Sequence, residues 1–181
     1  MERIVGDIWA SSNEDVLPAA EAGKGYLALT PYPGGSNFDI HQRIKEHILD
    51  KGKSDLKDPK SFGSVYYNSG LVNAAIAVEA IRAGQKKFGN RPLKGEEGRW
   101  GLEHLDLGDA RLKEIGFLGL MQPLKLSCSD HEGGGAAKVQ QWDGAQWTLV
   151  TDWIQADRPT LRPLIDAKAA EYAKEKGVTA R

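Results

Sequence analysis

Strand and helix signals alternate along the first 50 residues, and this alternation limits the fold more than any other feature of the sequence. Short apolar runs at residues 4–10 and 25–30 predict two strands. Helical patterns follow them at residues 15–24 and 37–50, the first with Pro18 in its opening turn. Such alternation is typical of an α/β layer in which the strands run parallel.

The strongest helix signal covers residues 64–84, where apolar side chains occur on most sides. A helix without a polar face is normally buried on more than one side, and Gly84 is suited to end it as a left-handed cap. Two shorter helices are expected at residues 95–105 and 109–115.

The second half of the chain has β character. A short strand is expected at residues 124–127, and a loop at residues 130–135. Residues 137–142 and 146–153 flank Asp143-Gly144, a pair favoured in tight hairpin turns. A last helix is predicted over residues 160–176.

Composition narrows the classes of partner. The 181 residues contain 24 Lys plus Arg and 25 Asp plus Glu, which gives a formal net charge of −1. This balance gives no electrostatic reason to expect a nucleic-acid partner. The apolar run at the N-terminus is too short for a signal peptide, and no segment is long enough to cross a bilayer. Cys128 is the single cysteine, so packing alone must hold the fold.

Two motifs invite a chemical interpretation that their context does not support. The glycines at residues 133–135 lack the following helix, Lys and hydroxyl of a phosphate loop, so a connecting loop is the better interpretation. Cys128, Asp130, His131 and Glu132 include metal-ligating types, but adjacent residues on a short loop rarely converge on one ion. We expect no catalytic residue, no metal and no cofactor, and therefore a binding protein rather than an enzyme.

Aromatic and small polar side chains occur just after the predicted strands and at the start of the long helix, and we call this set the rim. Its members are Trp9, Ser11, Ser12, Tyr32, Tyr67 and Asn68. In open α/β sheets, ligands bind beyond the carboxyl ends of the strands. Core packing is the alternative for Trp9, and capping of a helix is the alternative for the two serines.

Several blocks together resemble the type I periplasmic solute-binding proteins of ABC importers, in the leucine/isoleucine/valine receptor family. The blocks are GYLAL from Gly25, VNAAIAVEAIR from Val72, RWGLE from Arg99, DHEGGG from Asp130, VQQWDG from Val139 and DWIQADR from Asp152. Their order and spacing match over nearly the whole chain, although only the C-terminal portion of such a protein is covered.

The resemblance implies an α/β fold in which two Rossmann-like lobes are joined by crossing segments. On this basis residues 1–120 are expected to be part of the second lobe. Residues 121–155 would form a crossing segment and a β-hairpin that joins the first lobe, and residues 156–181 would form the C-terminal helix.

The resemblance also implies a function. The chain would be the solute-binding component of an ABC transporter for branched-chain amino acids or related small or aromatic carboxylates, in a truncated form. The six rim residues would face the ligand cleft, and the closed protein would dock on a membrane permease. The family is periplasmic, whereas the chain as written carries no signal peptide and would stay in the cytoplasm.

The short length raises one further expectation. If the first lobe is missing, the hairpin has lost the sheet that it extends, and an unpaired edge is exposed. We therefore expect self-association or a split partner that supplies the first lobe. The alternative function is a non-binding remnant or a protein-assembly module.

Overall fold

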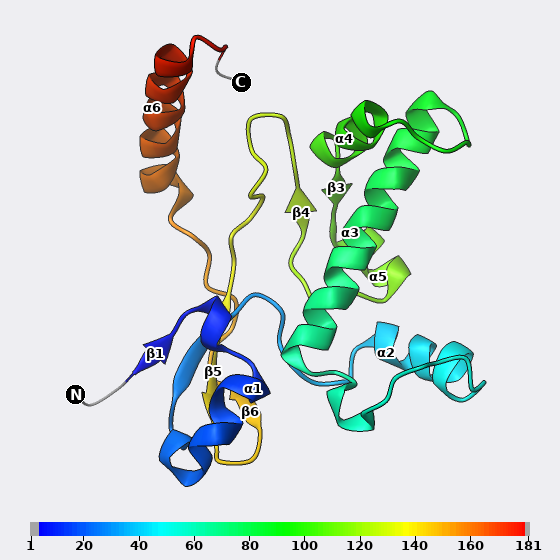
Figure 1. Ribbon diagram of the computed structural model, residues 1–181, viewed down its shortest axis with the longest axis vertical. Coiled ribbons are helices and arrows are strands. Elements are labelled where there is room, and N and C mark those ends of the chain that lie inside the picture. The colour runs from blue at the N-terminus through cyan, green and yellow to red at the C-terminus, as the bar shows by residue number, and fades with distance from the viewer. Residues whose placement is uncertain (1–3, 180–181) are drawn as a thin grey trace.

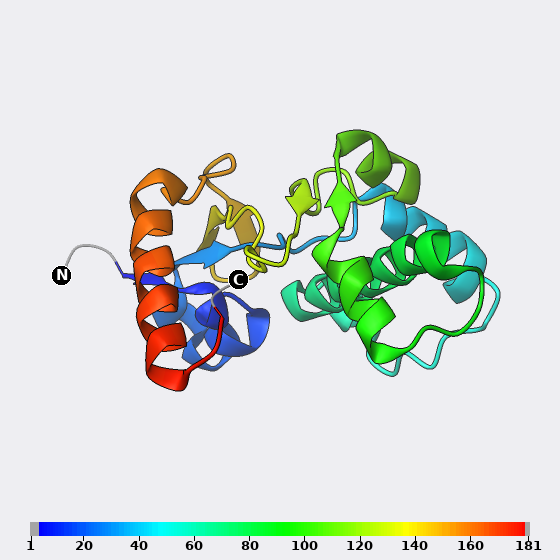
Figure 2. The same cartoon turned by 90° about the horizontal axis from the view of Figure 1, so that it is seen from above.

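A computed structural model describes residues 4–179, which form two bodies lying side by side (Figure 1). We call residues 4–30 together with 137–179 the sheet body, and residues 38–126 the helical body. The view from above shows the same two groups of elements (Figure 2).

Two stretches of chain join the bodies. Residues 31–37 form the first crossing, and residues 127–136 form the second crossing. The sheet body is therefore assembled from both ends of the chain, and the helical body from its middle. The predicted domain boundaries at residues 120 and 155 stay a prediction.

The sheet body is built on a four-stranded sheet with the order β1-β2-β5-β6. Its strands are β1 (Val5–Gly6), β2 (Leu27–Thr30), β5 (Lys138–Trp142) and β6 (Trp147–Leu149). β1 and β2 are parallel, as the alternation of strands and helices predicts, but the other two pairings are antiparallel. The fold is thus mixed α/β.

The predicted hairpin is confirmed, but the expectation that it has lost its sheet is wrong. β5 pairs with β2 along its length, from Leu27 opposite Gln141 to Thr30 opposite Lys138. Asp143 shapes the turn, because its Oδ1 accepts hydrogen bonds of 2.8 Å from the backbone N–H groups of Ala145 and Gln146.

The segment between β1 and β2 is less regular than its sequence predicts. β1 covers two residues and is followed by a 3-10 helix at Ile8–Ala10. The expected helix at residues 15–24 is replaced by α1 (Asn13–Val16) and a 3-10 segment, Leu17–Gly23. Ala20 interrupts that segment with a φ of 46°, which explains why no continuous helix forms.

The helical body contains four helices and a small antiparallel sheet. The helices are α2 (Asp39–Ile44), α3 (Val65–Phe88), α4 (Gly95–Glu103) and α5 (Asp109–Ile115). A π-helical turn, Lys45–Leu49, extends α2, and a 3-10 turn, Pro59–Ser61, precedes α3. The strands β3 (Asp106–Leu107) and β4 (Leu124–Lys125) pair with each other.

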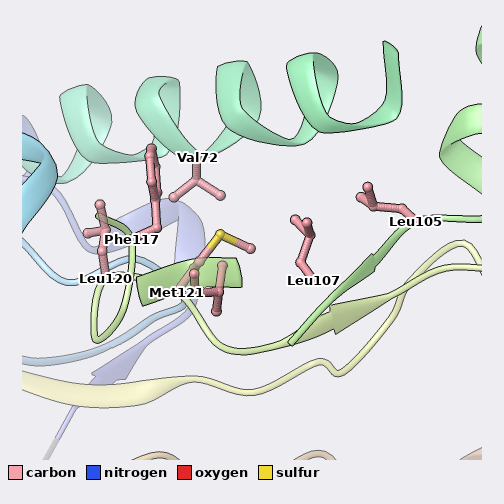
Figure 3. Packing of buried hydrophobic residues seen from close by; sticks show 7 residues of the cluster. Val72, Leu105, Leu107, Phe117, Leu120 and Met121 are labelled. Carbon is pink, nitrogen blue, oxygen red and sulfur yellow. The ribbon is translucent and has the colours of Figure 1, made fainter. Parts of the chain in front are cut away.

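The core of the helical body lies between α3 and the chain that runs from β3 to β4 (Figure 3). Val72 of α3 faces Leu107, Phe117, Leu120 and Met121, and each of these side chains is at most 5% exposed. Burying such side chains is the main source of stability that this packing can supply.

The long helix differs from its prediction in two ways. α3 passes through Gly84 and ends at Gly89, whose φ of 102° suits a residue without a Cβ. It is also less buried than its composition suggests, since Tyr66, Val78 and Ile81 are each about half exposed. The last helix, α6 (Arg158–Lys176), is confirmed. Among residues 4–179, no helix combines the length and the apolar character needed to cross a membrane.

Candidate functional site

A hollow of about 150 Å³ lies where the two bodies meet. Tyr32 of the first crossing and Glu132 of the second crossing line it, together with Ile76 of α3. Gln122 and Trp153 complete the wall from the helical body and the sheet body. Segments far apart in the sequence thus converge on one small space.

The lining offers an apolar surface with a few polar groups. Tyr32 is partly buried, and burial raises the pKa of its hydroxyl, so the phenol keeps its proton at neutral pH. The Lys138 ammonium lies 5.1 Å from the centre of the Trp153 ring, a cation–π distance. Such a mixture of aromatic walls and isolated polar groups is typical of sites for small molecules.

Tyr32 is the residue of the predicted rim that lines this hollow. Trp9 is not among the lining residues, and its side chain is 77% exposed on the sheet body. The core-packing alternative for Trp9 is therefore not realised among the described residues.

Ser11 and Ser12 are buried and already hydrogen-bonded. The Ser11 hydroxyl donates to the carbonyl of Ile8 at 2.9 Å. Oδ2 of Asp15 accepts hydrogen bonds from the Ser12 hydroxyl at 2.8 Å and from the Ser12 backbone N–H at 2.9 Å. The second of these bonds is one half of a capping box on α1, in which the Ser12 side chain also accepts from the Asp15 backbone N–H. The contacts of Ser12 correspond to the capping alternative, and a ligand-binding role for the two serines stays a prediction.

Tyr67 and Asn68 lie at the start of α3, within the helical body. Tyr67 packs against Phe62 with ring centres 5.2 Å apart, and burial raises the pKa of its hydroxyl. Asn68 is fully buried and donates to the carbonyls of Pro33 and Gly35. Neither residue lines the hollow, so the structure does not bring the six predicted residues together there, and Tyr32 is the one that lines it.

The second crossing is held by ion pairs. Asp130 pairs with Arg158 and, at 3.8 Å, with Arg162, both on α6. His131 lies 3.5 Å from the carboxylate of Glu103 at the end of α4. No cluster of three or more metal-ligating side chains occurs within residues 4–179.

Two glycines of the second crossing have backbone conformations that favour glycine. Gly133 has a φ of 71°, and a Cβ there would lie 2.3 Å from Cδ1 of Leu124. Gly135 also has a positive φ, of 69°. The connecting-loop interpretation therefore accounts for these residues through geometry alone.

Tyr32 is the one predicted site residue that lines the hollow, and four of the lining residues that sequence reasoning missed are Ile76, Gln122, Glu132 and Trp153. Three of them belong to blocks that carry the resemblance, since Ile76, Glu132 and Trp153 lie in VNAAIAVEAIR, DHEGGG and DWIQADR. Membership of those blocks was the signal available, whereas no local pattern singles out Gln122.

The sequence matches no protein-family model, and no curated protein matches it. The fold, however, is that of part of a type I periplasmic binding protein of ABC transporters. A branched-chain amino acid ABC transporter from Thermus thermophilus, solved with bound valine, matches 87% of this chain with a TM-score of 0.65 at 21% identity. A solute-binding protein from R. palustris in complex with benzoate matches 86% with a TM-score of 0.53 at 14% identity.

A solved protein of much higher identity has the same fold. It is described as an ABC transporter permease from the Pseudomonas fluorescens group, and it is 75% identical over 98% of this chain with a TM-score of 0.94. The fold shared with the branched-chain amino acid transporter from Thermus thermophilus confirms the resemblance seen in the sequence. This chain spans 43% of that protein, 41% of the Thermus protein and 38% of the R. palustris protein.

Proposed function

We propose that this chain is a truncated, C-terminal part of the solute-binding component of an ABC transporter. The hollow between the two bodies carries this proposal, because a site that takes walls from two bodies can couple ligand binding to their relative position. The structural neighbours with bound valine and benzoate point to branched-chain amino acids or aromatic carboxylates as ligands.

Tyr32 is the proposed centre of the ligand site. Its neutral hydroxyl can donate to a ligand carboxylate, and Ile76 and Trp153 can contact an apolar side chain. Trp9, Ser11, Ser12, Tyr67 and Asn68 remain proposed ligand-binding residues. Trp9 is already exposed but would have to approach the ligand, and the other four would need to become accessible or to act through a neighbour.

The proposed mechanism is closure around the two crossings. Ligand that contacts both bodies stabilises the arrangement in which they lie closest. The closed form would then dock on the membrane permease in the periplasm, where a carrier of this kind acts. This role involves binding without a chemical step.

Binding can be tested by calorimetry with valine, leucine and benzoate. If Tyr32 contacts the ligand, Tyr32→Ala should weaken binding by about tenfold or more, which corresponds to one lost hydrogen bond and lost packing. Tyr172→Ala, in the exposed part of α6, is the matched control and should bind as the parent does. Equal binding by both variants, or no binding of any of the three ligands, would contradict the proposal.

A second candidate function, protein assembly, has an observation in its favour. The sheet body has a hollow of about 600 Å³ lined by small and apolar residues that include Ile4, Val16 and Ala19. Trp9 and Leu164 are exposed by 77% and 62%. Exposed apolar surface on the sheet body is consistent with contacts to another chain.

We propose that a second copy, or a chain carrying the missing part of the fold, covers this surface. Light scattering after size exclusion at micromolar concentration tests the first case. A dimer or larger species is expected for the parent. A strictly monomeric protein that also fails to bind a co-expressed upstream segment would overturn this proposal while leaving the ligand site untouched.

A further inference from the structure

Asn68 fastens the first crossing to the helical body. Its Nδ2 donates to the carbonyl of Pro33 at 2.8 Å and to that of Gly35 at 3.0 Å. It also lies 3.4 Å from the carbonyl of Gly63, the residue just before the N-cap of α3. One buried amide therefore holds the crossing and the start of α3 together.

The orientation of this amide fixes the state of His41. Because the carbonyls require donors, the NH₂ group of Asn68 must face them, and its Oδ1 faces His41 at 2.7 Å. An amide oxygen only accepts, so Nε2 of His41 carries the hydrogen. The remaining ring nitrogen, Nδ1, is then unprotonated in a neutral imidazole.

The surroundings of His41 do not accommodate a second proton. The side chain is fully buried on α2, and Phe38, Phe62 and Tyr67 surround it with ring centres 5.2 to 6.1 Å away. Nδ1 has no hydrogen-bonding partner among residues 4–179. Protonation would place an N–H without an acceptor, and a charge, among aromatic rings.

We propose that His41 and Asn68 form an acid-released clasp on the first crossing. At pH values above the pKa of His41, the neutral ring donates a hydrogen bond to Oδ1 of Asn68, and the Asn68 amide donates to the carbonyls of Pro33 and Gly35. His41 can take up a second proton only when it separates from Asn68 and the aromatic rings around it. This separation also breaks the hydrogen bonds from Asn68 to the first crossing. The two bodies then move more independently.

The charged groups around His41 do not offset this effect. Asp39 and Arg43, two residues away on either side, pair with each other at 2.6 Å on the exposed side of α2. Tyr67 is the titratable group among the contacting rings, and its pKa is raised, so it stays neutral. Lys60, two residues before Phe62, is exposed, and the first crossing contributes only Tyr32, which is also neutral.

The direction of the pH effect follows from linkage. Burial lowers the pKa of His41 below its ordinary value of 6.5, and the hydrogen bond to Asn68 partly opposes this. The clasped state is thus fully favoured above pH 6.5 and loses its advantage as the pH falls below that value. In this range the ratio of open to closed clasp rises by up to about tenfold per pH unit, since opening takes up one proton.

The distance between the bodies can be measured with two spin labels. Lys53→Cys in the helical body and Ala145→Cys in the hairpin turn provide exposed attachment sites, in a background of Cys128→Ser. At about pH 7.5 we expect a narrow distance distribution, and at about pH 5 a broader one. Unchanged distributions in this parent protein would overturn the proposal.

Two variants separate His41 from other titrating groups. Gln at position 41 can still donate to Asn68 but does not titrate, so His41→Gln should keep the narrow distribution at both pH values. His47→Gln, an exposed histidine in the turn that extends α2, should broaden like the parent. Broadening in His41→Gln would overturn the proposal.

A second measurement applies if His41→Gln does not fold. The ring of His41 can be followed by NMR in the parent, and its titration midpoint should coincide with the midpoint of the broadening. A midpoint that matches another histidine instead would also overturn the proposal. Because no ligand is present, these results do not depend on the proposed function.

Discussion

Glu79 of α3 is a nearly buried carboxylate whose neighbours compensate its charge. Arg111 of α5 donates to both of its oxygens at 2.8 Å, and Arg82 donates at 3.1 Å. The bonds from Arg111 are the main reason that the pKa of Glu79 is lowered. The side chain therefore stays ionised at neutral pH and ties α5 to α3.

We predict that Arg111→Ala destabilises the protein by about 1–3 kcal/mol, because a nearly buried carboxylate loses its two best donors. Urea unfolding monitored by circular dichroism measures the change in free energy. The matched control is Arg43→Ala, which removes an exposed pair with Asp39 and should cost less than about 1 kcal/mol. Equal losses in the two variants would show that Arg111 has no special role.

At this scale the sequence predicts residue types better than residue roles. Tyr32 was predicted from its place after a strand, and it does line the hollow between the bodies. Asn68 is predicted from its place at the start of the long helix, yet its amide donates to carbonyls 33 and 35 residues away in sequence. Partners at such separations leave no local pattern, so a structural amide and a ligand-binding amide look alike in the sequence.

At the scale of elements, α3 and α4 approach each other through glycines. A Cβ on Gly101 of α4 would lie 2.1 Å from the carbonyl oxygen of Ala80 and 3.2 Å from the backbone nitrogen of Gly84. Gly84 in turn faces Leu93 and the backbone of Glu97. The contact between the two helices thus depends on the absence of side chains at this point.

We predict opposite effects for two glycines of α4. Gly101→Ala should destabilise the protein by about 1–3 kcal/mol, since the added methyl group forces the helices apart. Gly98→Ala should stabilise it by up to about 1 kcal/mol, because no atom lies within 4 Å of the added Cβ and alanine favours the helix. Thermal unfolding of both variants distinguishes them, and a loss of stability in Gly98→Ala would refute the argument.

The same glycines explain one error of the sequence prediction. Gly84 resembles a helix end because glycine often occupies that position, but here it allows α4 to pack. The helix at residues 15–24 fails for a different reason, since the positive φ of Ala20 interrupts it. The hairpin and α6 are predictable because the Asp143 turn and the Asp157 cap are local in the sequence.

At the scale of the whole molecule, the second crossing is attached to both bodies. Asp130 and the carbonyl of Gly133 accept hydrogen bonds from Arg158 at the start of α6. The Arg162 guanidinium donates to the carbonyl of Ser129 at 2.5 Å. Few apolar contacts hold α6, because Ala173 is its only buried residue. These polar contacts are therefore its main attachment to the described part of the chain.

We predict that Asp130→Ala loosens α6. Hydrogen exchange of the amides in residues 158–176 should accelerate several-fold, because Arg158 and Arg162 lose their common partner. Asp166→Ala, which removes a pair with Arg162 within α6, is the control and should leave the start of the helix protected. Unchanged exchange in Asp130→Ala would mean that other contacts position α6.

The two-body arrangement was the least predictable feature. The resemblance indicated crossing segments, yet the pairing of β2 with β5 joins residues more than 100 positions apart. Local patterns also misjudge burial. α3 and the start of the chain have the composition of buried segments, but several of their apolar side chains are exposed.

The chain leaves the sheet body once and returns to it once, so the helical body is an insertion between two parts of the sheet body. We expect that lengthening or shortening residues 38–126 leaves the register of β2 against β5 unchanged, because these strands flank that segment on both sides. The two bodies can thus diversify separately, except at the two crossings and at the residues that hold them, such as Asn68 and Arg158.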